Sequence, residues 1–433
     1  MDRDLVAIGG FVLLFVLMAL RVPIGVAMGA VGVAGYALLT DTGPALGLLM
    51  HSPLRTVTDY NFSIIPMFVL MGVFASSAGM SRELFRASIA WLGHLPGGLA
   101  VATIFACGGF AAINGSSVAT AAAMTTLALP EMRGAGYRPS IAAGVIASGG
   151  TLGIMIPPSG VMVIYGLLTD QDISQLFIAG ILPGLLAIAL YVVTVQIIAW
   201  RRADWLPRGR RHSWPERWES LRGIWATMLL FAFVIGGMYG GLFTVTEAAG
   251  MGAVGALIIG VLRGQLNGAR IMTSLIEALR ITAAIFTIAV GAFLFGYFLT
   301  ITQTTQNLTS LLLGLDFGRY GVLAIILFAY LILGAIMDEL AMILLTVPIV
   351  FPVIIGLGFD PIWFGVIIVM VVTLGMICPP VGINCFVINS IARDLSLVSI
   401  YRGVSPFILT DIIRLAILCA VPWISLVLPN TMK

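Results

Sequence analysis

Charge is scarce in this sequence of 433 residues, since only 9% of them are Asp, Glu, Lys or Arg. Ordinary soluble domains carry about 25% charged residues. Hydrophobic residues make up 60% of the chain, and their long unbroken runs are unlike the alternating strands of a transmembrane β-barrel. The composition therefore predicts an all-α, polytopic membrane protein that spends most of its length inside a lipid bilayer.

Groups for catalysis and metal binding are also few. The chain has three histidines, which fall in loops, and four cysteines without a CxxC pair, and its only lysine is Lys433. A P-loop needs a GxxxxGK[ST] motif, so this chain cannot itself be a P-loop ATPase. We find no clustered His, Asp or Arg set of the kind a membrane enzyme would need. The basic residues lie in short loops, which membrane topology explains, and we expect no nucleic acid as a partner.

A ten-residue segment occurs twice in the chain. TLGIMIPPSG at 151–160 returns 222 residues later as TLGMICPPVG at 373–382, with six of ten positions identical. Both copies lie inside apolar stretches, where a glycine and two prolines indicate a helix that breaks, and a break used twice points to a transporter's binding site. We therefore predict two related halves, 1–200 and 223–433, joined by a basic linker, 201–222, that contains seven arginines.

The proline pairs at 157–158 and 379–380 predict free carbonyl groups. Proline has no N–H to donate to the carbonyl four residues before it, and a free carbonyl in hydrocarbon is costly. The carbonyls concerned are those of Gly153, Ile154, Gly375 and Met376. A hard cation such as Na⁺ prefers oxygen ligands, and the half-helix that follows a break presents N–H groups to a carboxylate. The alternative is an ordinary proline kink repaired by neighbouring helices.

Two apolar stretches, 98–130 and 320–352, are interrupted by polar residues near their middles. These are Asn114, Ser116, Ser117 and Thr120 in the first stretch, and Asp338 and Glu339 in the second. Each stretch predicts a re-entrant hairpin with its tip inside the protein, and each precedes one broken helix, at 141–168 and 361–390. The tip oxygens are candidate ligands. Hydrogen bonding between helices, or contact with water, remains the alternative for each of them.

The remaining apolar runs predict spans near 5–20, 23–39, 62–80, 175–200, 223–241, 245–262, 276–300 and 404–428. Five spans and one hairpin per half give an odd number of crossings, so the two halves are inverted. With the N-terminus outside, seventeen arginines fall inside, including the linker. Four basic residues fall outside, namely Arg3, Arg55, Arg319 and Lys433. This bias follows the positive-inside rule.

Two smaller features complete the pattern. Segments 81–96 and 303–318, which precede the hairpins, are either interfacial arm helices or loops. Asp411 and Arg414 are three residues apart in the last span, and we interpret them as a structural pair on one helix face.

The whole chain resembles the large membrane subunit of tripartite ATP-independent periplasmic (TRAP) transporters. The resemblance is carried by the residues around NGSSVAT at 114–120, GGTLG at 149–153, TEAA at 246–249, MDE at 337–339 and PPVG at 379–382. It implies two inverted repeats of the ion-transporter-superfamily, elevator type. It also implies import of a C4-dicarboxylate or sugar acid with Na⁺ across a bacterial inner membrane. The implied partners are a small membrane subunit of about four helices and a periplasmic substrate-binding protein.

The resemblance further implies two Na⁺ sites, each between a hairpin and its broken helix. The first falls on Asn114, Gly153, Ile156 and Pro158, and the second on Gly334, Gly375, Cys378 and Pro380. We expect the substrate at Ser116, Ser117, Thr120, Ser159, Asp338 and Asn384. The residue after Asp338 departs from the family pattern. A stand-alone Na⁺/dicarboxylate carrier remains the alternative, and dependence on a binding protein distinguishes the two.

Overall fold

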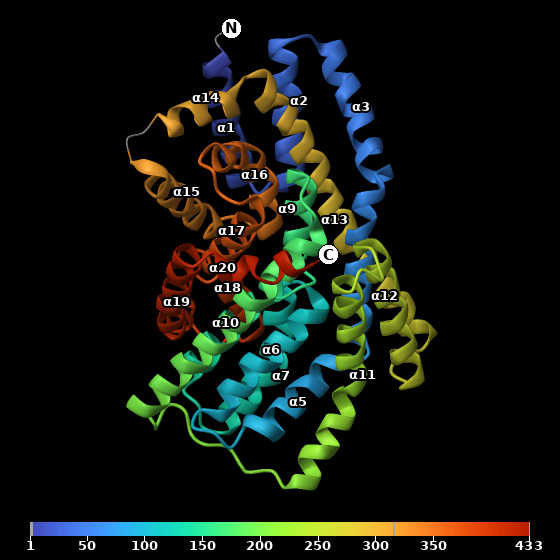
Figure 1. Ribbon diagram of the computed structural model, residues 1–433, viewed down its shortest axis with the longest axis vertical. Coiled ribbons are helices and arrows are strands. Elements are labelled where there is room, and N and C mark those ends of the chain that lie inside the picture. The colour runs from blue at the N-terminus through green and yellow to red at the C-terminus, as the bar shows by residue number, and fades with distance from the viewer. Residues whose placement is uncertain (1–2, 315–316, 433) are drawn as a thin grey trace.

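The computed structural model describes residues 3–314 and 317–432, and every regular element in these ranges is helical. Eight of the described helices are long and apolar enough to cross a membrane, and the molecule is elongated along one axis (Figure 1). The prediction of an all-α, polytopic membrane protein is confirmed. Lys433, which the charge count placed outside, and part of segment 303–318 lie outside the described residues.

The described part of the first half contains ten α-helices and one short 3-10 helix. They are α1 Arg3–Ala19, α2 Ile24–Leu39, α3 Thr42–Thr58, η1 Tyr60–Ser63, α4 Ile64–Ser77, α5 Met80–Leu92, α6 Gly98–Asn114, α7 Ser117–Gly134, α8 Pro139–Met155, α9 Gly160–Thr169 and α10 Ile173–Arg201.

The second half follows the same plan. Its elements are α11 Trp214–Tyr239, α12 Val245–Leu262, α13 Gly268–Ile301, α14 Thr304–Leu313, α15 Gly318–Gly334, α16 Glu339–Gly356, α17 Pro361–Gly375, α18 Ile383–Ile391, α19 Leu397–Ala420, α20 Trp423–Leu426 and η2 Pro429–Thr431.

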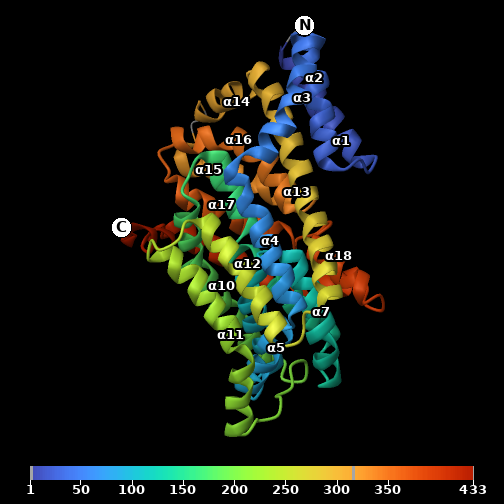
Figure 2. The same ribbon diagram turned by 90° about the vertical axis from the view of Figure 1, so that its right-hand side faces the viewer.

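The elements of the two halves correspond at the spacing of the sequence repeat. Helices α7 and α16 both have 18 residues and begin 222 residues apart, at Ser117 and Glu339. Helices α8 and α17 begin at Pro139 and Pro361, again 222 residues apart. In both views α5 and α7 lie toward one end of the molecule and α14 to α16 toward the other (Figures 1 and 2). The α6–α7 and α15–α16 hairpins therefore enter from opposite ends, as inverted repeats require.

The helices form two groups that pack mainly within themselves. Helices α1 to α4 pack with α11 to α13, which we call the outer group, and α6 to α10 pack with α15 to α19, which we call the hairpin group. Contacts between the groups come mainly from α4 against α6 and α9, and from α13 against α16. Helix α5 joins α11 to α6, and α14 joins α13 to α16. Of the segments left open as arm helices or loops, 81–96 is helical up to Leu92, where α5 ends, and 303–318 is helical over Thr304–Leu313, which is α14.

Two regions of the outer group differ from the expected spans. Helix α13 has 34 residues and begins at Gly268, before the predicted span 276–300. The prediction covered only the apolar run, and the helix extends beyond it through exposed first turns that contain polar residues. Its counterpart in the first half is divided into α3 and α4 by η1. No element was predicted for α3, since this helix mixes polar and apolar residues and contains Pro53. Asp59 ends α3, and its carboxylate accepts the N–H of Asn61 at 2.9 Å.

The predicted linker, 201–222, is shorter in the structure. Helix α10 ends at Arg201, and α11 already begins at Trp214. A capping box starts α11, in which the Ser213 N–H donates to Glu216 Oε2 at 2.7 Å. The Trp and Pro that open this helix extend it beyond the apolar run that was used to predict the span.

The rest of the linker lies against the base of the first hairpin. The Tyr137 hydroxyl donates to the Pro207 carbonyl at 2.8 Å and accepts the Leu99 N–H at 3.1 Å. Burial raises the pKa of Tyr137 to about 12, so the phenol keeps its proton at neutral pH. The Arg138 guanidinium lies 4.1 Å from the Trp205 ring centroid. The linker is therefore held by the hairpin group.

Glycine pairs let helices of the outer group approach closely. A Cβ at Gly291 of α13 would lie 2.0 Å from the Gly25 carbonyl oxygen of α2, a separation that no side chain tolerates. We expect Gly291→Ala to push the helices apart, at a cost of about 1–3 kcal/mol, and to lower the unfolding temperature measured by tryptophan fluorescence. Gly296→Ala on the same helix has nothing within 4 Å and serves as the control. Equal unfolding temperatures for the two variants would contradict the close crossing.

Candidate functional site

Each hairpin tip is capped by a side chain at the equivalent position of the repeat. In the first tip, α6 ends at Asn114 and Ser116 Oγ accepts the N–H of Ala119 at 3.4 Å. In the second tip, Asp338 Oδ2 accepts the N–H of Leu340 at 3.1 Å. Capping satisfies a donor that a helix start leaves unpaired. Ser116 and Asp338 therefore have a local structural role in addition to any contact with a ligand.

The first tip packs on the break between α8 and α9, backbone against backbone. A Cβ at Gly153 would lie 2.3 Å from the Ser116 carbonyl oxygen, and one at Gly115 would lie 2.6 Å from the Pro158 carbonyl oxygen. Gly115 also has φ +63°, which glycine adopts without strain. Only glycine fits at these two positions.

The carbonyl of Gly153 has no backbone donor in the turn that follows it. Pro157 has no N–H, and the N–H of Ile156 donates to the Leu152 carbonyl at 3.0 Å. Within residues 3–314 and 317–432, no turn, loop or cap hydrogen bond ends on the Gly153 oxygen. Both lone pairs of this oxygen are thus available where α8 stops.

The second break differs from the expectation. A Cβ at Gly375 would lie 2.6 Å from the Gly334 carbonyl carbon, so tip and break again touch through their backbones. The Gly375 carbonyl accepts the Cys378 N–H at 3.1 Å, however, and the Met376 carbonyl accepts the Asn384 N–H at 3.1 Å. The prediction that these two carbonyls are free is wrong, because the chain closes a tight turn after Gly375. Each oxygen keeps one lone pair.

A cavity of about 520 Å³ lies between the two tips. Asn114, Ser116, Pro158 and Asp338, all predicted site residues, line it together with Glu339. Its other wall belongs to the outer group, and comprises Ile65, Phe68, Val69 and Val73 of α4 and Ile281, Ala284, Ile285 and Ile288 of α13. Sequence reasoning missed this wall, because apolar residues inside a span give no sign of which partner they face.

Glu339 is the most unusual residue of the cavity. Its side chain is 6% exposed, and its Oε2 atom has no hydrogen-bond partner among the described residues. Buried polar atoms are normally paired. A group bound in the cavity that donates a hydrogen bond would satisfy this oxygen. The polar tip at 337–339 marked the position in the sequence, although only Asp338 was taken as a site residue.

The other expected substrate residues do not line this cavity. Ser117, Thr120 and Asn384 are fully buried, and the Asn384 amide donates to Ser117 Oγ at 2.8 Å. Thr120 donates to the Ser116 carbonyl at 2.7 Å, and Ser159 caps α9 by accepting the Met162 N–H. Asn384 thus ties the second broken helix to the first hairpin. These side chains shape the cavity from behind its lining.

The first set of expected cation ligands fits an oxygen-binding ion better than the second. Asn114 Nδ2 is buried without a partner among the described residues, but this atom is a hydrogen-bond donor, so only the amide oxygen of Asn114 could bind a cation. Ile156 and Pro158 belong to the same break, next to the unpaired Gly153 carbonyl. In the second set, Pro380 is exposed and its carbonyl already accepts the Tyr401 hydroxyl at 2.9 Å. Within the described ranges, no three or more His, Cys, Asp or Glu side chains gather as a metal site.

Known proteins resemble the chain over most of its length. The family described as "Tripartite ATP-independent periplasmic transporter, DctM component" matches residues 11–424. The C4-dicarboxylate TRAP transporter large permease protein DctM of Pseudomonas aeruginosa is 36% identical over 397 residues, covering 89% of this chain and 92% of that protein. The sialic acid TRAP transporter large permease protein SiaM of Vibrio cholerae is 31% identical over 410 residues, covering 94% and 95%.

A solved structure shares the fold. The YdaH transporter of Alcanivorax borkumensis superimposes with a TM-score of 0.63, covering 90% of this chain and 91% of that one, at 16% sequence identity. At so low an identity the likeness supports the arrangement of helices and nothing about the site.

The contact at Gly153 generates a prediction about the first tip. Gly153→Ala places a methyl group against the Ser116 carbonyl, so the tip must move away, at a cost of about 1–3 kcal/mol. We expect faster amide hydrogen exchange in residues 115–119. Gly134→Ala, at the far end of α7 with nothing within 4 Å, controls for substitution in the hairpin. Unchanged exchange at the tip would show that it does not depend on this contact.

Proposed function

Because the chain belongs to the family of the large membrane component, DctM, of tripartite ATP-independent periplasmic transporters, we propose that it imports a small organic acid together with Na⁺ and receives the acid from a periplasmic binding protein. Its relatives are named as permeases, so the prediction of a transporter and not an enzyme is confirmed. Their names include C4-dicarboxylates and sialic acid, both organic acids.

The observation that carries the proposal is the cavity between the two hairpin tips. Three helices begin at its lining, α7 after Ser116, α9 at Gly160 and α16 at Glu339. The N-terminal N–H groups of a helix attract negative charge. The starts of α7 and α9 carry no acidic side chain of their own, and this end of the cavity suits a carboxylate.

Na⁺ coupling is supported by the free carbonyl at the first break. Gly153 offers an oxygen with two lone pairs, and Asn114, at the end of α6, adds an amide oxygen. Oxygen ligands without a His or Cys cluster favour a hard ion over a transition metal. The second set, at Gly375 and Cys378, would require a lone pair left over from the turn hydrogen bonds. We propose both as Na⁺ sites. The first offers more oxygen lone pairs that no donor among the described residues uses.

The division into two groups supports an elevator mechanism. The tips and the first break belong to the hairpin group, while Phe68 and Ile285 on the opposite wall belong to the outer group. If the hairpin group slides along this apolar wall, the acid and its Na⁺ travel with it. The side chains of α4 and α13 that line the cavity are apolar, and apolar surfaces slide without breaking hydrogen bonds.

Orientation and partners follow from the same proposal. We place the protein in a bacterial inner membrane with the N-terminus in the periplasm and the arginine-rich linker in the cytoplasm, as the charge distribution favours. The word tripartite in the family description leaves two further components. We propose a small membrane subunit of about four helices and a soluble periplasmic binding protein.

Glu339 favours acids that also carry hydrogen-bond donors. Glu339 lines a cavity whose lining also contains Asp338 and no Arg, Lys or His, and its Oε2 atom is buried without a partner among the described residues. A second carboxylate on the substrate could not donate to that oxygen, whereas a hydroxyl or ammonium group could. We therefore propose a hydroxylated acid, such as a sugar acid, in preference to a C4-dicarboxylate.

Uptake by reconstituted vesicles tests the central proposal. With the small membrane subunit and the binding protein present, we expect an inward Na⁺ gradient to drive accumulation of the acid, and a choline gradient to drive none. Added ATP should have no effect, because no P-loop is present in the chain.

Three results would count against the proposal in different ways. Uptake that requires ATP and ignores Na⁺ would overturn it. Uptake that depends on Na⁺ but is unchanged when the binding protein is omitted would instead favour a stand-alone carrier. A protein that accumulates acids equally in choline would refute the coupling and leave the family assignment intact.

Substitution of Glu339 tests the substrate class. We expect excess succinate to inhibit uptake by Glu339→Gln more strongly than uptake by the wild type, by about tenfold, because the Gln amide adds an N–H donor for a second carboxylate. Excess gluconate should inhibit uptake by Glu339→Gln no more strongly than it inhibits uptake by the wild type. The same binding protein is used with the wild type and with the variant, so a difference in inhibition between them arises in this chain. Glu277→Gln, an exposed acid of α13, is the control. Equal inhibition profiles for wild type and Glu339→Gln would rule out this role.

A further inference from the structure

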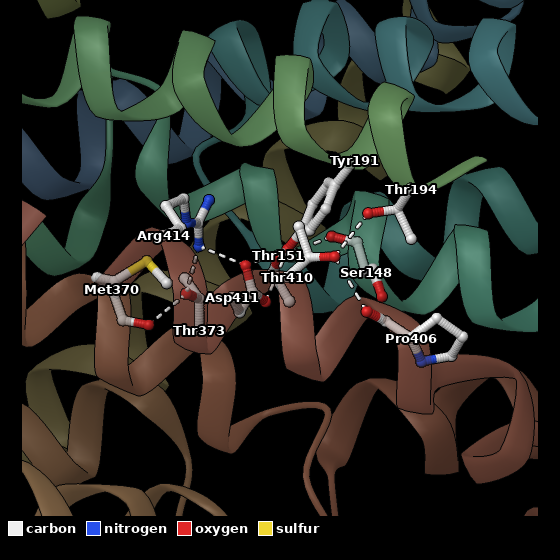
Figure 3. Close-up of polar contacts among 10 residues, drawn as sticks. All are labelled: Ser148, Thr151, Tyr191, Thr194, Met370, Thr373, Pro406, Thr410, Asp411 and Arg414. Atoms are coloured by element: carbon white, nitrogen blue, oxygen red, sulfur yellow. Dashed lines mark hydrogen bonds and ion pairs between the residues drawn. The ribbon is translucent and has the colours of Figure 1, made fainter. Parts of the chain in front are cut away.

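A buried ion pair lies on α19, apart from the cavity. Asp411 and Arg414 are 0% and 1% exposed, and Arg414 Nη2 lies 3.0 Å from Asp411 Oδ1. Figure 3 shows side chains of three other helices gathered around the pair, Tyr191 from α10, Thr151 from α8 and Thr373 from α17. Neither the pair nor its hydrogen-bond partners Tyr191 and Thr373 are among the residues that line the cavity, so the proposed binding of acid leaves the pair unexplained.

The carboxylate end of the pair is connected to the first broken helix. The Tyr191 hydroxyl donates to both oxygens of Asp411, at 2.9 and 2.8 Å. The Thr151 hydroxyl donates to the Ser148 carbonyl at 2.6 Å, and its oxygen lies in contact with the Tyr191 oxygen at 3.1 Å. Thr151 stands two residues before Gly153, where α8 meets the first hairpin tip.

The guanidinium end is connected to the second broken helix. Arg414 Nη2 also lies 3.5 Å from Thr373 Oγ1, a long and therefore weak hydrogen bond. Thr373 stands two residues before Gly375, where α17 meets the second hairpin tip. Thr151 and Thr373 are the first residues of the two copies of the repeated segment. The ion pair is thus connected to the same position of both repeats, directly at Thr373 and through Tyr191 at Thr151.

Simple stability does not account for this arrangement. Arg414 Nε and Nη1 are buried without a partner among the described residues. A buried ion pair with unsatisfied donors is often no more stable than well-packed apolar residues in its place. Such a pair does, however, favour one relative position of the helices that it joins, because its hydrogen bonds are directional.

We propose that Asp411 and Arg414 form a strut that positions the two breaks relative to each other, so that Na⁺ bound at one break improves the binding of Na⁺ at the other. Through Tyr191 and Thr151 the strut sets the position of Gly153, and through Thr373 that of Gly375. These are positioning residues, since none of them contacts the ions. The inference rests on the proposed coupling to Na⁺, and it names the contacts that join the two sites.

The test measures binding of Na⁺ without transport. The full chain in lipid nanodiscs is unfolded by heat while Na⁺ replaces choline at constant ionic strength. The slope of the unfolding temperature against the logarithm of Na⁺ concentration, which is proportional to the number of ions bound, is plotted against Na⁺ concentration. We expect a sigmoidal curve for the wild type. Tyr191→Phe removes the hydroxyl between Asp411 and Thr151, and Thr373→Val removes the contact with Arg414. In both variants we expect a Hill coefficient near one and a midpoint raised about fivefold or more.

A matched control lies one residue from Asp411. Thr410 is hydrogen-bonded to Thr194 at 2.6 Å and to the Pro406 carbonyl at 3.0 Å, and it contacts neither break. Thr410→Val should lower the unfolding temperature at all Na⁺ concentrations while it keeps the sigmoidal curve. This control separates a loss of stability from a loss of coupling between the two Na⁺ sites. If Tyr191→Phe does not fold, Thr373→Val alone provides the test.

The outcomes separate the strut from the proposed function. A wild-type curve in which Na⁺ acts no differently from choline would overturn both the coupling to Na⁺ and the strut. A Na⁺-dependent wild-type curve with a Hill coefficient of one would overturn the strut alone. So would variants Tyr191→Phe and Thr373→Val that keep the wild-type midpoint and Hill coefficient, even if their unfolding temperatures are lower.

Discussion

The contact of each hairpin tip with the glycine of its broken helix is the constraint on which the rest of the structure depends. A helix that stops inside a membrane leaves polar backbone groups that lipid cannot satisfy. Here each stop is covered by another segment's backbone, the Ser116 carbonyl at Gly153 and the Gly334 backbone at Gly375. Ser116 and Pro158 beside the first of these ends, and Asp338 of the second tip, line the cavity. Replacing either glycine forces the covering segment away.

The two copies of this contact have diverged in detail. The first keeps the Gly153 carbonyl without a donor, while the second uses the carbonyls of Gly375 and Met376 in its own turn. Asn384, which closes that turn, also donates to Ser117 of the opposite hairpin. The inverted halves therefore do not provide two equal sites. Equivalent backbone carbonyls are thus left without a backbone donor among the described residues at the first break and accept turn hydrogen bonds at the second.

Much of this arrangement could be predicted from local sequence. Glycine and paired prolines break helices through their own chemistry, so the breaks after Met155 and Gly375 were expected close to where they occur. The polar tips were expected for the same reason, since Asn114 and Asp338 stand out in apolar runs. Helix α3 was missed because its residues are mixed in polarity, and they form a helix by packing on α2 and α13.

The sequence by itself determined the membrane class, the repeat and the residues at which helices stop, because each depends on composition or on the backbone chemistry of single residues. Only the tertiary structure decided what those stops face. It placed the apolar wall of α4 and α13 across from the tips and joined Thr151 to Thr373 through Asp411 and Arg414. It also left the Glu339 oxygen without a partner. These relations join residues far apart in the chain, and apolar packing between distant helices leaves no local pattern from which to infer them.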